Sequence, residues 1–509
     1  MATTSEQTAG ASLEALARSA ADFGPGSPGH EHVDPVRSAE RRPLYADRVK
    51  VYPRLAHGTF RRIKWIILTV LLTGYYLLPW LRWDRGPAAP DQAVLLDIAT
   101  RRFYFFSLEV WPQEIYYLTG LLILASLSLF LVTSVAGRVW CGYTCPQTLW
   151  TDLFVHIERL IEGDRNKRMR ADKAPWTMGK VARKTLKHAI WLVIAVATGG
   201  AWVFYFSDAP TLAARLLAFD APTPAYVFIG VFAGFTYLLG GIAREQVCIY
   251  MCPWPRIQGA MVDSESLLVG YKEDRGEPRG PHKKGATWEG RGDCVDCHAC
   301  VAVCPMGIDI RDGFQLECIQ CALCIDACNT IMDKVGRPRG LVGYDTFANI
   351  DRRATGEKPR YPVIRPRTVL YFAAMALVGA IMLATFSART DLDVTVIRDR
   401  NPLFVVLSDG SVRNRYTVRI LNKAHEARVF DVALVGLDGA RLKLNSPFAE
   451  DGIAVGPDSR RKVDYLVTMS QDLSRQALDG GNADVSFVVR DRATGFTIET
   501  ASSFKGPDR

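Results

Sequence analysis

"CVDCHACVAVCP" (residues 294–305) and "CIQCALCIDACN" (residues 318–329) are the two stretches that decide how this chain folds. Each of them reads C-x2-C-x2-C-x3-C. With this bacterial spacing, three cysteines of one run hold one 4Fe–4S cluster and the fourth cysteine binds the other cluster. The sequence therefore predicts two 4Fe–4S clusters, which together form an electron relay.

The crossed pattern also predicts the ligands of each cluster. The first cluster is assigned to Cys294, Cys297, Cys300 and Cys328, and the second to Cys318, Cys321, Cys324 and Cys304. Thiolates suit this role because iron in a cluster is held by soft sulfur ligands. A pair of zinc sites is the alternative, but tetrahedral zinc is typical of two separated C-x2-C knuckles, not of two runs of four.

Two residues beside these ligands need separate interpretation. His298 lies inside the first run, but four cysteines already complete each set, so we expect it to be a neighbouring or surface residue. Asn329 stands where the bacterial pattern has a proline. No ligand is lost by this change, but the turn after Cys328 is expected to differ.

The other four cysteines form a second kind of motif, which occurs twice. "VWCGYTCPQTLW" (139–150) carries Cys141 and Cys145, and "QVCIYMCPWPRIQGAM" (246–261) carries Cys248 and Cys252. All twelve cysteines thus belong to spaced clusters between positions 141 and 328. A secreted disulfide framework would spread cysteines through the chain, so this distribution indicates ligand chemistry.

Each of these motifs is C-x3-C-P, and the proline suggests what the thiols do. Proline is favoured at the first position of a helix, which places Cys145 and Cys252 at or near helix N-caps. The helix dipole lowers the pKa of a thiol there. Such thiolates suit a soft metal such as Cu(I) or reversible disulfide chemistry, whereas buried inert cysteine is the alternative.

Three further side chains near these motifs could assist a metal. His57 precedes the first membrane span, His156 follows the first motif, and Met251 lies inside the second motif. Each has an ordinary alternative as a hydrogen-bonded histidine or a lipid-facing methionine.

Five apolar stretches are long enough to cross a bilayer, which needs about 20 helical residues. We place them at 64–81, 115–136, 187–206, 225–243 and 368–386. A buried core helix is the alternative for any one of them. The order span, span, C-x3-C-P, helix occurs twice, so the chain contains an internal repeat with all four thiols at the same membrane face.

The basic residues predict the orientation in the membrane. Lys and Arg are frequent before the first span and in the loop 137–186, whereas 207–224 holds only Arg215. Because short cytoplasmic loops are rich in Lys and Arg, we expect the N-terminus and segment 244–367 in the cytoplasm and the C-terminus in the periplasm of a bacterial inner membrane. No signal peptide opens the chain, and 1–36 is expected to be disordered.

Composition agrees with a membrane protein that has soluble parts. The 509 residues have a mean hydropathy of only +0.04, which disfavours a fully embedded transporter. The net charge of +9 is modest and is explained by basic loops, so no nucleic-acid partner is expected.

The region 391–509 alternates apolar and polar residues in the manner of strands. Four such runs lie at 416–423, 429–437, 461–469 and 483–491, separated by turn signals. Short strands at this spacing predict an immunoglobulin-like sandwich, although the Cys–Trp–Cys core of antibody domains is absent. Nothing in it indicates catalysis, so a binding or docking role is expected.

The predicted fold class is therefore a multi-domain membrane protein: a five-helix bundle, a ferredoxin-like two-cluster domain and an all-β sandwich. The predicted domains are 1–36, the span region 37–243, the cluster domain 244–367, the fifth span 368–386 and the sandwich 391–509.

With these motifs in this order, the sequence resembles the CcoG family of cytochrome oxidase accessory proteins, also called FixG or RdxA. The supporting stretches are "VYPRLAHGTFRRIKW" (51–65), "WCGYTCPQTLWTD" (140–152), "CIYMCPWPRIQGAM" (248–261) and "GDCVDCHACVAVCPMGIDIRDGFQLECIQCALCIDAC" (292–328). The resemblance implies assembly of a cbb3-type cytochrome c oxidase through reduction of Cu(II) to Cu(I), with copper handled by Cys141, Cys145, Cys248 and Cys252.

The favoured hypothesis is thus a membrane-bound cupric reductase that acts as an oxidase assembly factor. Its expected partners are the membrane, copper ions, a cytosolic electron donor, and a copper-transporting ATPase or oxidase assembly factors. One alternative is a quinol-linked electron-transfer subunit that feeds a partner reductase. The other is a non-catalytic scaffold whose clusters are structural.

Overall fold

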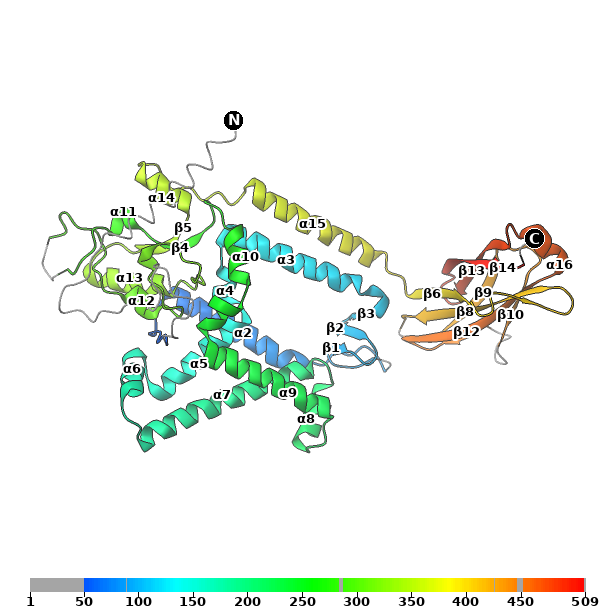
Figure 1. Cartoon of the computed structure of the whole chain (residues 1–509), viewed down its shortest axis with the longest axis horizontal. Coiled ribbons are helices and arrows are strands. Elements are labelled where there is room, and N and C mark those ends of the chain that lie inside the picture. The colour runs from blue at the N-terminus through cyan, green and yellow to red at the C-terminus, as the bar shows by residue number, and fades with distance from the viewer. Residues whose placement is uncertain (1–49, 88, 283–286, 425, 446–451, 508–509) are drawn as a thin grey trace. The chain divides into compact units, whose positions relative to one another are not determined.

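The computed structural model describes residues 50–507 apart from 88, 283–286, 425 and 446–451 (Figure 1). The segment 1–36, expected to be disordered, lies outside the described residues. The chain divides into two compact units. The first consists mainly of Glu109–Ile381 with the chain up to Leu81, and the second mainly of Met382–Arg509.

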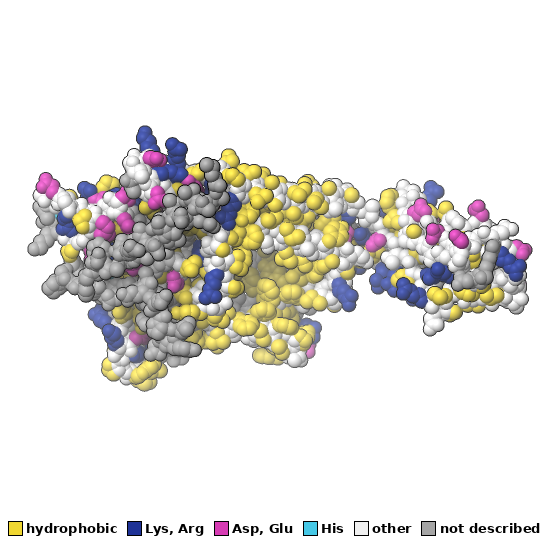
Figure 2. Space-filling view, turned by 45° about the horizontal axis from the view of Figure 1, so that its top comes forward, with side chains coloured by type: hydrophobic (Ala, Val, Ile, Leu, Met, Phe, Trp, Pro, Cys, Tyr) yellow, Lys and Arg dark blue, Asp and Glu magenta, His cyan; other side chains and the backbone are white. Residues whose placement is uncertain are grey.

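Among the described residues, five helical stretches are long and apolar enough to cross a membrane. They are α2 (Thr59–Leu77) with η1 (Leu78–Trp80), η2 (Pro112–Glu114) with α3 (Tyr116–Ala136), α7 (Met178–Phe204), α9 (Thr223–Phe235) with η3 (Thr236–Ala243), and α15 (Pro366–Ser387). Figure 2 shows hydrophobic side chains gathered over the surface of the unit that holds these helices. The protein is therefore a membrane protein with five spans, as the sequence predicts.

Three of these spans differ in detail from the sequence prediction. Helix α2 begins at Thr59, five residues before the predicted start at 64. Helix α7 begins at Met178, nine residues before the predicted start at 187, because its basic first turns are already helical outside the apolar stretch. The fourth span changes from α-helix to the π-helical segment η3 at Thr236. Gly240 and Gly241 lie in that segment, and their backbone passes close to the rings of Phe154 and Trp191.

The third and fourth spans pack closely because a small residue allows it. Gly199 of α7 faces α9 so tightly that a Cβ there would lie 2.5 Å from the carbonyl oxygen of Ile229. Helix α15 lies beside α3, where the rings of Phe130 and Tyr371 are 6.1 Å apart (Figure 1).

Shorter elements connect the spans. A three-stranded sheet of β1 (Val94–Asp97), β2 (Arg102–Phe105) and β3 (Leu108–Val110) joins the first span to the second. The chain between the second and third spans forms α4 (Val139–Tyr143), α5 (Pro146–Glu162) and α6 (Arg165–Lys173), and α8 (Ala209–Leu217) follows the third span. After the fourth span come η4 (Val247–Met251) and α10 (Trp254–Met261).

The cysteine-rich segment is closed at its two ends by a pair of antiparallel strands. These are β4 (Leu268–Tyr271) and β5 (Val342–Asp345), with Leu268 opposite Asp345. Between them lie α11 (Glu273–Gly276), α12 (Ala299–Val303), η5 (Ile310–Asp312) and α13 (Leu323–Val335), and α14 (Phe347–Ala354) follows. Helices α12 and α13 pack on each other and α13 also packs on α2, so the segment rests on the first span.

The second unit is a two-sheet sandwich. One sheet has the order β10 (Arg441–Leu444), β12 (Ser459–Met469), β8 (Val412–Asn422), β6 (Leu392–Arg398), and β7 (Val405–Val406) also pairs with β8. The other has the order β11 (Ile453–Val455), β9 (Arg428–Val435), β13 (Asn482–Asp491), β14 (Thr497–Lys505), with α16 (Gln471–Ala477) before β13. Tyr416, Phe487 and Phe504 are fully buried between the sheets. The predicted C-terminal all-β sandwich is confirmed.

Candidate iron–sulfur and thiol site

The structure brings the eight cysteines of the two runs to two cavities of nearly equal size. One cavity, with about 360 Å³ of space between atoms including open solvent, is lined by Cys294, Cys297, Cys300 and Cys328, here called the first quartet. The other, of about 370 Å³, is lined by Cys304, Cys318, Cys321 and Cys324, here called the second quartet. Cys300 also touches the second cavity, so the two cavities are neighbours.

The backbone of both runs is wound in the same unusual way. Asp296 and His298 in the first run have φ of 56° and 51°, and Gln320 and Ala322 at the matching places in the second run have φ of 54° and 58°. Residues other than glycine rarely adopt this left-handed backbone conformation, which costs about 1–3 kcal/mol. The same cost at matching positions of both runs indicates that each loop is shaped to surround a group.

Backbone N–H groups point at several of these sulfur atoms. The N–H of Gln320 donates to Cys318 Sγ at 3.4 Å. Burial raises the pKa of Cys304 to about 11, whereas N–H groups of residues 306–308 act to lower it. Burial also raises the pKa of Cys318 and of Cys328 to about 12. A buried thiolate needs a compensating cation, and iron supplies one, so the donor set fits an iron–sulfur cluster.

The two residues singled out beside the ligands have other partners. The His298 ring lies 3.1 Å from an Arg311 guanidinium nitrogen and 3.4 Å from an Asp296 carboxylate oxygen. Asn329 lies inside α13, which continues through Cys328 to Val335, and its side chain accepts a hydrogen bond from the N–H of Gly340. A proline at 329 would break this helix, which explains its replacement.

The two C-x3-C-P motifs share a backbone break four residues before the first cysteine. Gly137 ends α3 with φ 57° and ψ −123°, and Arg244 ends η3 with φ 45° and ψ −113°. Glycine adopts this conformation readily, but arginine does not. The Arg244 guanidinium is held by Glu158 at 2.9 Å and by the carbonyl oxygen of Gly241 at 2.7 Å.

The two copies of the repeat exchange their helices. Helix α5, which follows the first motif, packs on η3 at the end of the fourth span, and α10, which follows the second motif, packs on α3. Cys145 is the N-cap of α5 with Pro146 at the first position, whereas Cys252 precedes Pro253, the N-cap of α10. This exchange places both motifs at the same end of the helix bundle.

The four thiols of these motifs, here called the membrane thiols, lie near one another. They are Cys141, Cys145, Cys248 and Cys252, and all four are partly buried. Burial raises the pKa of Cys141 to about 12; the thiols of the other three also raise it, whereas Arg138 lowers it. Cys141 Sγ donates to Gln258 Oε1 at 3.1 Å, which joins the first motif to the helix after the second.

The membrane thiols are packed against the second quartet. Gly142 approaches the cluster loop so closely that a Cβ there would lie 2.7 Å from the carbonyl oxygen of Ile319 and 3.0 Å from Cys321 Cα. The Tyr143 hydroxyl donates to the carbonyl oxygen of Cys321 at 3.2 Å. Cys141 and Cys248 also belong to the apolar cluster that contains Ile319, Cys321 and Leu323.

Arg138 stabilises the contact between the first motif and the second quartet. This contact is here called the seam. Its buried guanidinium donates to the carbonyl oxygens of Leu316, Cys318 and Pro255. Its backbone N–H donates to Gln320 Oε1 at 2.7 Å. One side chain therefore connects the first motif, the second motif and the second quartet.

The three side chains proposed as helpers of a metal are placed differently. The ring of His156 packs edge-on against Trp65 with centroids 4.6 Å apart, and burial lowers its pKa. Met251 is 62% exposed, and His57 is exposed. Within the described residues, no group of three or more His, Cys, Asp or Glu side chains is spaced to hold a single metal ion.

The spans, the two cysteine-lined cavities and the adjoining thiols define a membrane-bound iron–sulfur electron-transfer protein. Family models agree with this class: a "4Fe-4S dicluster domain" matches residues 243–347, and a "4Fe-4S binding domain" matches 118–163. Residues 382–507 match the "IG-like fold at C-terminal of FixG, putative oxidoreductase". The sandwich is thus immunoglobulin-like, as predicted.

Relatives with similar sequences cover most of the chain. The "Nitrogen fixation protein FixG" of Rhizobium meliloti is 52% identical over 86% of this chain and 90% of its own length. "Protein RdxA" and "Protein RdxB" of Cereibacter sphaeroides are 53% and 48% identical over 78% and 91% of this chain and 85% and 97% of their own lengths. A solved "FixG-related protein from Vibrio parahaemolyticus" is 25% identical, with a TM-score of 0.20, and covers 23% of this chain and 97% of its own. The chain belongs to the FixG/RdxA family.

Sequence reasoning missed the residues that join the membrane thiols to the second quartet. Gly142, Arg138 and Gln258 are not cysteines and stand in no known ligand pattern. One signal was present: Gly142 occupies a helical position where the second motif has Ile249, and glycine in a helix often marks a close backbone approach.

Proposed function

We propose that this protein carries electrons from a cytosolic donor through its two clusters to Cu(II), which is reduced to Cu(I) at the membrane thiols. The observation that carries the proposal is the seam, where Gly142 and Tyr143 of the first motif touch the backbone of the second quartet. A thiol site that only stored copper would have no need to lie against an electron relay.

The cluster ligands follow from the same geometry. We assign the first quartet to one 4Fe–4S cluster and the second quartet to the other, since each quartet lines one cavity. When bound, the clusters supply one-electron transfer. Cys297 is the exposed member of the first quartet, so we place the entry of electrons there.

Copper is the substrate of the proposed reaction and not a resident cofactor. Each Cu(II) takes one electron and becomes Cu(I), which prefers soft sulfur ligands, so the membrane thiols bind the product without being oxidised. The ion then passes to a copper-transporting ATPase or to assembly factors of a cbb3-type oxidase. Among the described residues the thiols form no preformed single-ion site, so we expect copper itself to draw them together.

The test is copper reduction by the purified, cluster-loaded full chain, followed with a chelator specific for Cu(I). A variant with serine at Cys141, Cys145, Cys248 and Cys252 should reduce Cu(II) much more slowly. Its cluster absorbance should match that of the wild type, which shows that the relay is intact. If the variant reduces copper at the wild-type rate, copper is not reduced at the membrane thiols.

A second candidate concerns the same four thiols. The family model that matches 118–163 is described as a 4Fe–4S binding domain, and that range contains Cys141 and Cys145. Four neighbouring thiolates can hold one further cluster. Iron and sulfide analysis decides between the two: the copper proposal requires the iron of the two quartets alone, and serine at the membrane thiols should leave that content unchanged.

The proposed sidedness puts the clusters in the cytoplasm and the sandwich in the periplasm of a bacterial inner membrane. The basic helix α6 and the basic start of α7 support it. In right-side-out vesicles, added protease should cut within 391–507 and leave the cluster domain intact. Cleavage of the cluster domain instead would reverse the orientation.

A further inference from the structure

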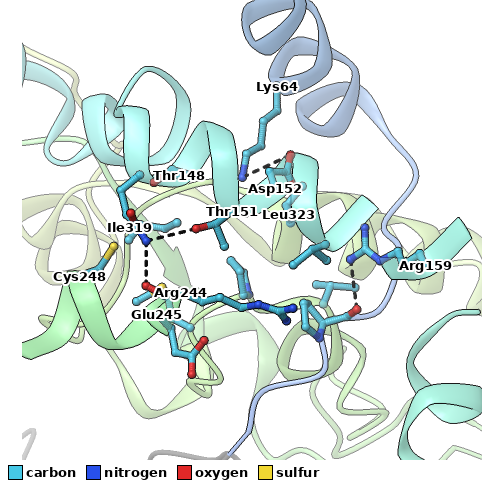
Figure 3. A pocket seen from close by; sticks show the side chains of 16 residues that line it. Lys64, Thr148, Thr151, Asp152, Arg159, Arg244, Glu245, Cys248, Ile319 and Leu323 are labelled. Atoms are coloured by element: carbon cyan, nitrogen blue, oxygen red, sulfur yellow. Dashed lines mark hydrogen bonds and ion pairs between the residues drawn. The ribbon is translucent and has the colours of Figure 1, made fainter. Parts of the chain in front are cut away.

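A cleft with a charged lining lies beside the second quartet. Figure 3 shows Lys64, Asp152, Arg159, Arg244 and Cys248 around it, with Cys248 and Arg159 at opposite ends of the view. It encloses about 500 Å³ of space between atoms, part of which is open solvent. Four of its lining residues also line the cavity of the second quartet: Pro305, Met306, Ile319 and Leu323. A ligand in the cleft would therefore be one layer of side chains from that cavity.

Arg159 is the least satisfied polar side chain of the cleft. Its side chain is 10% exposed, and its Nη2 donates to the carbonyl oxygens of Pro53 and Arg54. Its Nε and Nη1 have no hydrogen-bond partner within the described part of the chain, and the nearest carboxylate, Asp164, lies 3.7 Å from Nε. A buried guanidinium N–H group without a hydrogen-bond partner lowers the stability of the fold. The Nε and Nη1 groups of Arg159 can therefore donate to a further acceptor.

The cleft lining carries three cations, Lys64, Arg159 and Arg244, against two carboxylates, Asp152 and Glu245, so its net charge is positive. Asp152 is shared by Arg61 at 2.8 Å and Lys64 at 3.9 Å. Glu158 is shared by Arg168, Lys187 and Arg244, and Lys187 also reaches a neighbouring carboxylate.

Arg159 itself lies among other cations. Burial and the positive charges of Arg61 and Arg168 together lower its pKa to about 10, although Asp152 and Asp164 oppose them. An anion placed against Arg159 would relieve this excess of positive charge, whereas a metal cation would be repelled.

We propose that this cleft binds a phosphate-bearing ligand, whose oxygens accept hydrogen bonds from Arg159 and whose charge is balanced by Lys64 and Arg244. Guanidinium groups match phosphate geometry and bind it through paired N–H donors. The apolar part of the wall, formed by Val155, Met306 and Leu323, accommodates the non-polar part of the ligand.

Two sources of phosphate fit the position of the cleft. Lys64 belongs to the first turns of the first span, and Arg244 directly follows the fourth span, so the cleft lies at the ends of two membrane helices. A phospholipid head group and a soluble phosphate compound both reach this level of a membrane protein. Both present the same phosphate chemistry to Arg159.

The experiment uses the full-length, cluster-loaded protein and two probes. Radiolabelled inorganic phosphate is followed by equilibrium dialysis in detergent, and phosphatidylglycerol retained after extraction from bilayers of that lipid is followed by native mass spectrometry. The variants are Arg159→Gln, Arg159→Lys and the matched control Arg170→Gln, which changes an exposed arginine of α6. Visible absorbance of the clusters checks that each variant is folded.

Arg159→Gln should lower the affinity for whichever probe binds the wild type by about tenfold or more, because charged hydrogen bonds to phosphate contribute that much to binding. Arg159→Lys should retain part of the affinity, and Arg170→Gln all of it. Binding of phosphate identifies a soluble ligand, and retention of the lipid alone identifies a head group. If Arg159→Gln does not fold, Lys64→Gln must weaken binding instead. Failure of the wild type to bind either probe, or equal binding by wild type and variants, overturns the proposal.

Discussion

Gly142→Ala is the substitution that tests the seam most directly. The added Cβ would lie 2.7 Å from the carbonyl oxygen of Ile319 and 3.0 Å from the backbone nitrogen of Cys321. Both atoms belong to the backbone, which cannot turn aside as a flexible side chain can. The first motif must therefore move away from the second quartet to accommodate a single methyl group.

The size of the effect follows from two opposing contributions. A glycine inside a helix such as α4 gains about 0.5–1 kcal/mol when it is replaced by alanine. Overpacking a tight contact costs about 1–3 kcal/mol. The net loss for the docked seam is up to roughly 2 kcal/mol, which lowers the equilibrium constant for docking by up to about 30-fold.

Two measurements on the full chain check this prediction. The temperature at which cluster absorbance is lost should fall for Gly142→Ala, and its rate of Cu(II) reduction should fall with it. Gly179→Ala is the matched control, because nothing lies within 4 Å of its added Cβ and no loss is expected. If Gly142→Ala keeps the wild-type temperature and rate, the close contact at the seam does not exist.

Three further changes test other parts of the structure. Glu158→Gln removes the carboxylate shared by Arg168, Arg244 and Lys187, of which only Lys187 keeps another acidic partner among the described residues, and should cost roughly 3–5 kcal/mol. Because the pKa of Glu158 is lowered to about 2, its stabilisation is present above about pH 4.5 and disappears as pH falls toward 2; thermal unfolding midpoints should lose this dependence in the variant. Arg138→Met leaves buried carbonyl groups unpaired, so cluster absorbance should bleach faster in air than in wild type; equal bleaching would count against its fastening role. Tyr416→Phe removes a hydroxyl that donates to the carbonyl oxygen of Ser503 at 2.9 Å. The free energy of local opening near residue 503 should fall by about 0.5–1.5 kcal/mol, which is measured as faster amide hydrogen exchange. Unchanged exchange would show that the hydrogen bond does not stabilise this region.

The features predicted correctly from sequence are those with a strong one-dimensional signal. Membrane spans such as Tyr116–Ala136 are marked by long apolar runs, and the strands of the sandwich by alternation. The two cluster runs are marked by spacing alone. Each of these signals depends on neighbours in sequence, so it can be read without knowledge of the fold.

The remaining features depend on contacts between distant segments. The exchange of α5 and α10 between the two repeats, and the fastening of Leu316 and Pro255 by Arg138, bring together residues far apart in the chain. The change to π-helix at Thr236 likewise has no local marker, since the apolar run continues through it. Arg159 looks like an ordinary basic residue of a surface helix until its burial is known.

The seam has a consequence for how the protein is made. Both membrane motifs precede the second quartet in the sequence, so the spans before them can insert before the surface that Gly142 and Arg138 contact has been synthesised. We expect that surface to take its final shape when iron reaches the loop around Cys318 and Cys321. We therefore expect iron-starved cells to contain membrane-inserted chains in which the membrane thiols do not pack against the second quartet. Pulse-chase labelling should show that quality-control proteases degrade these chains faster.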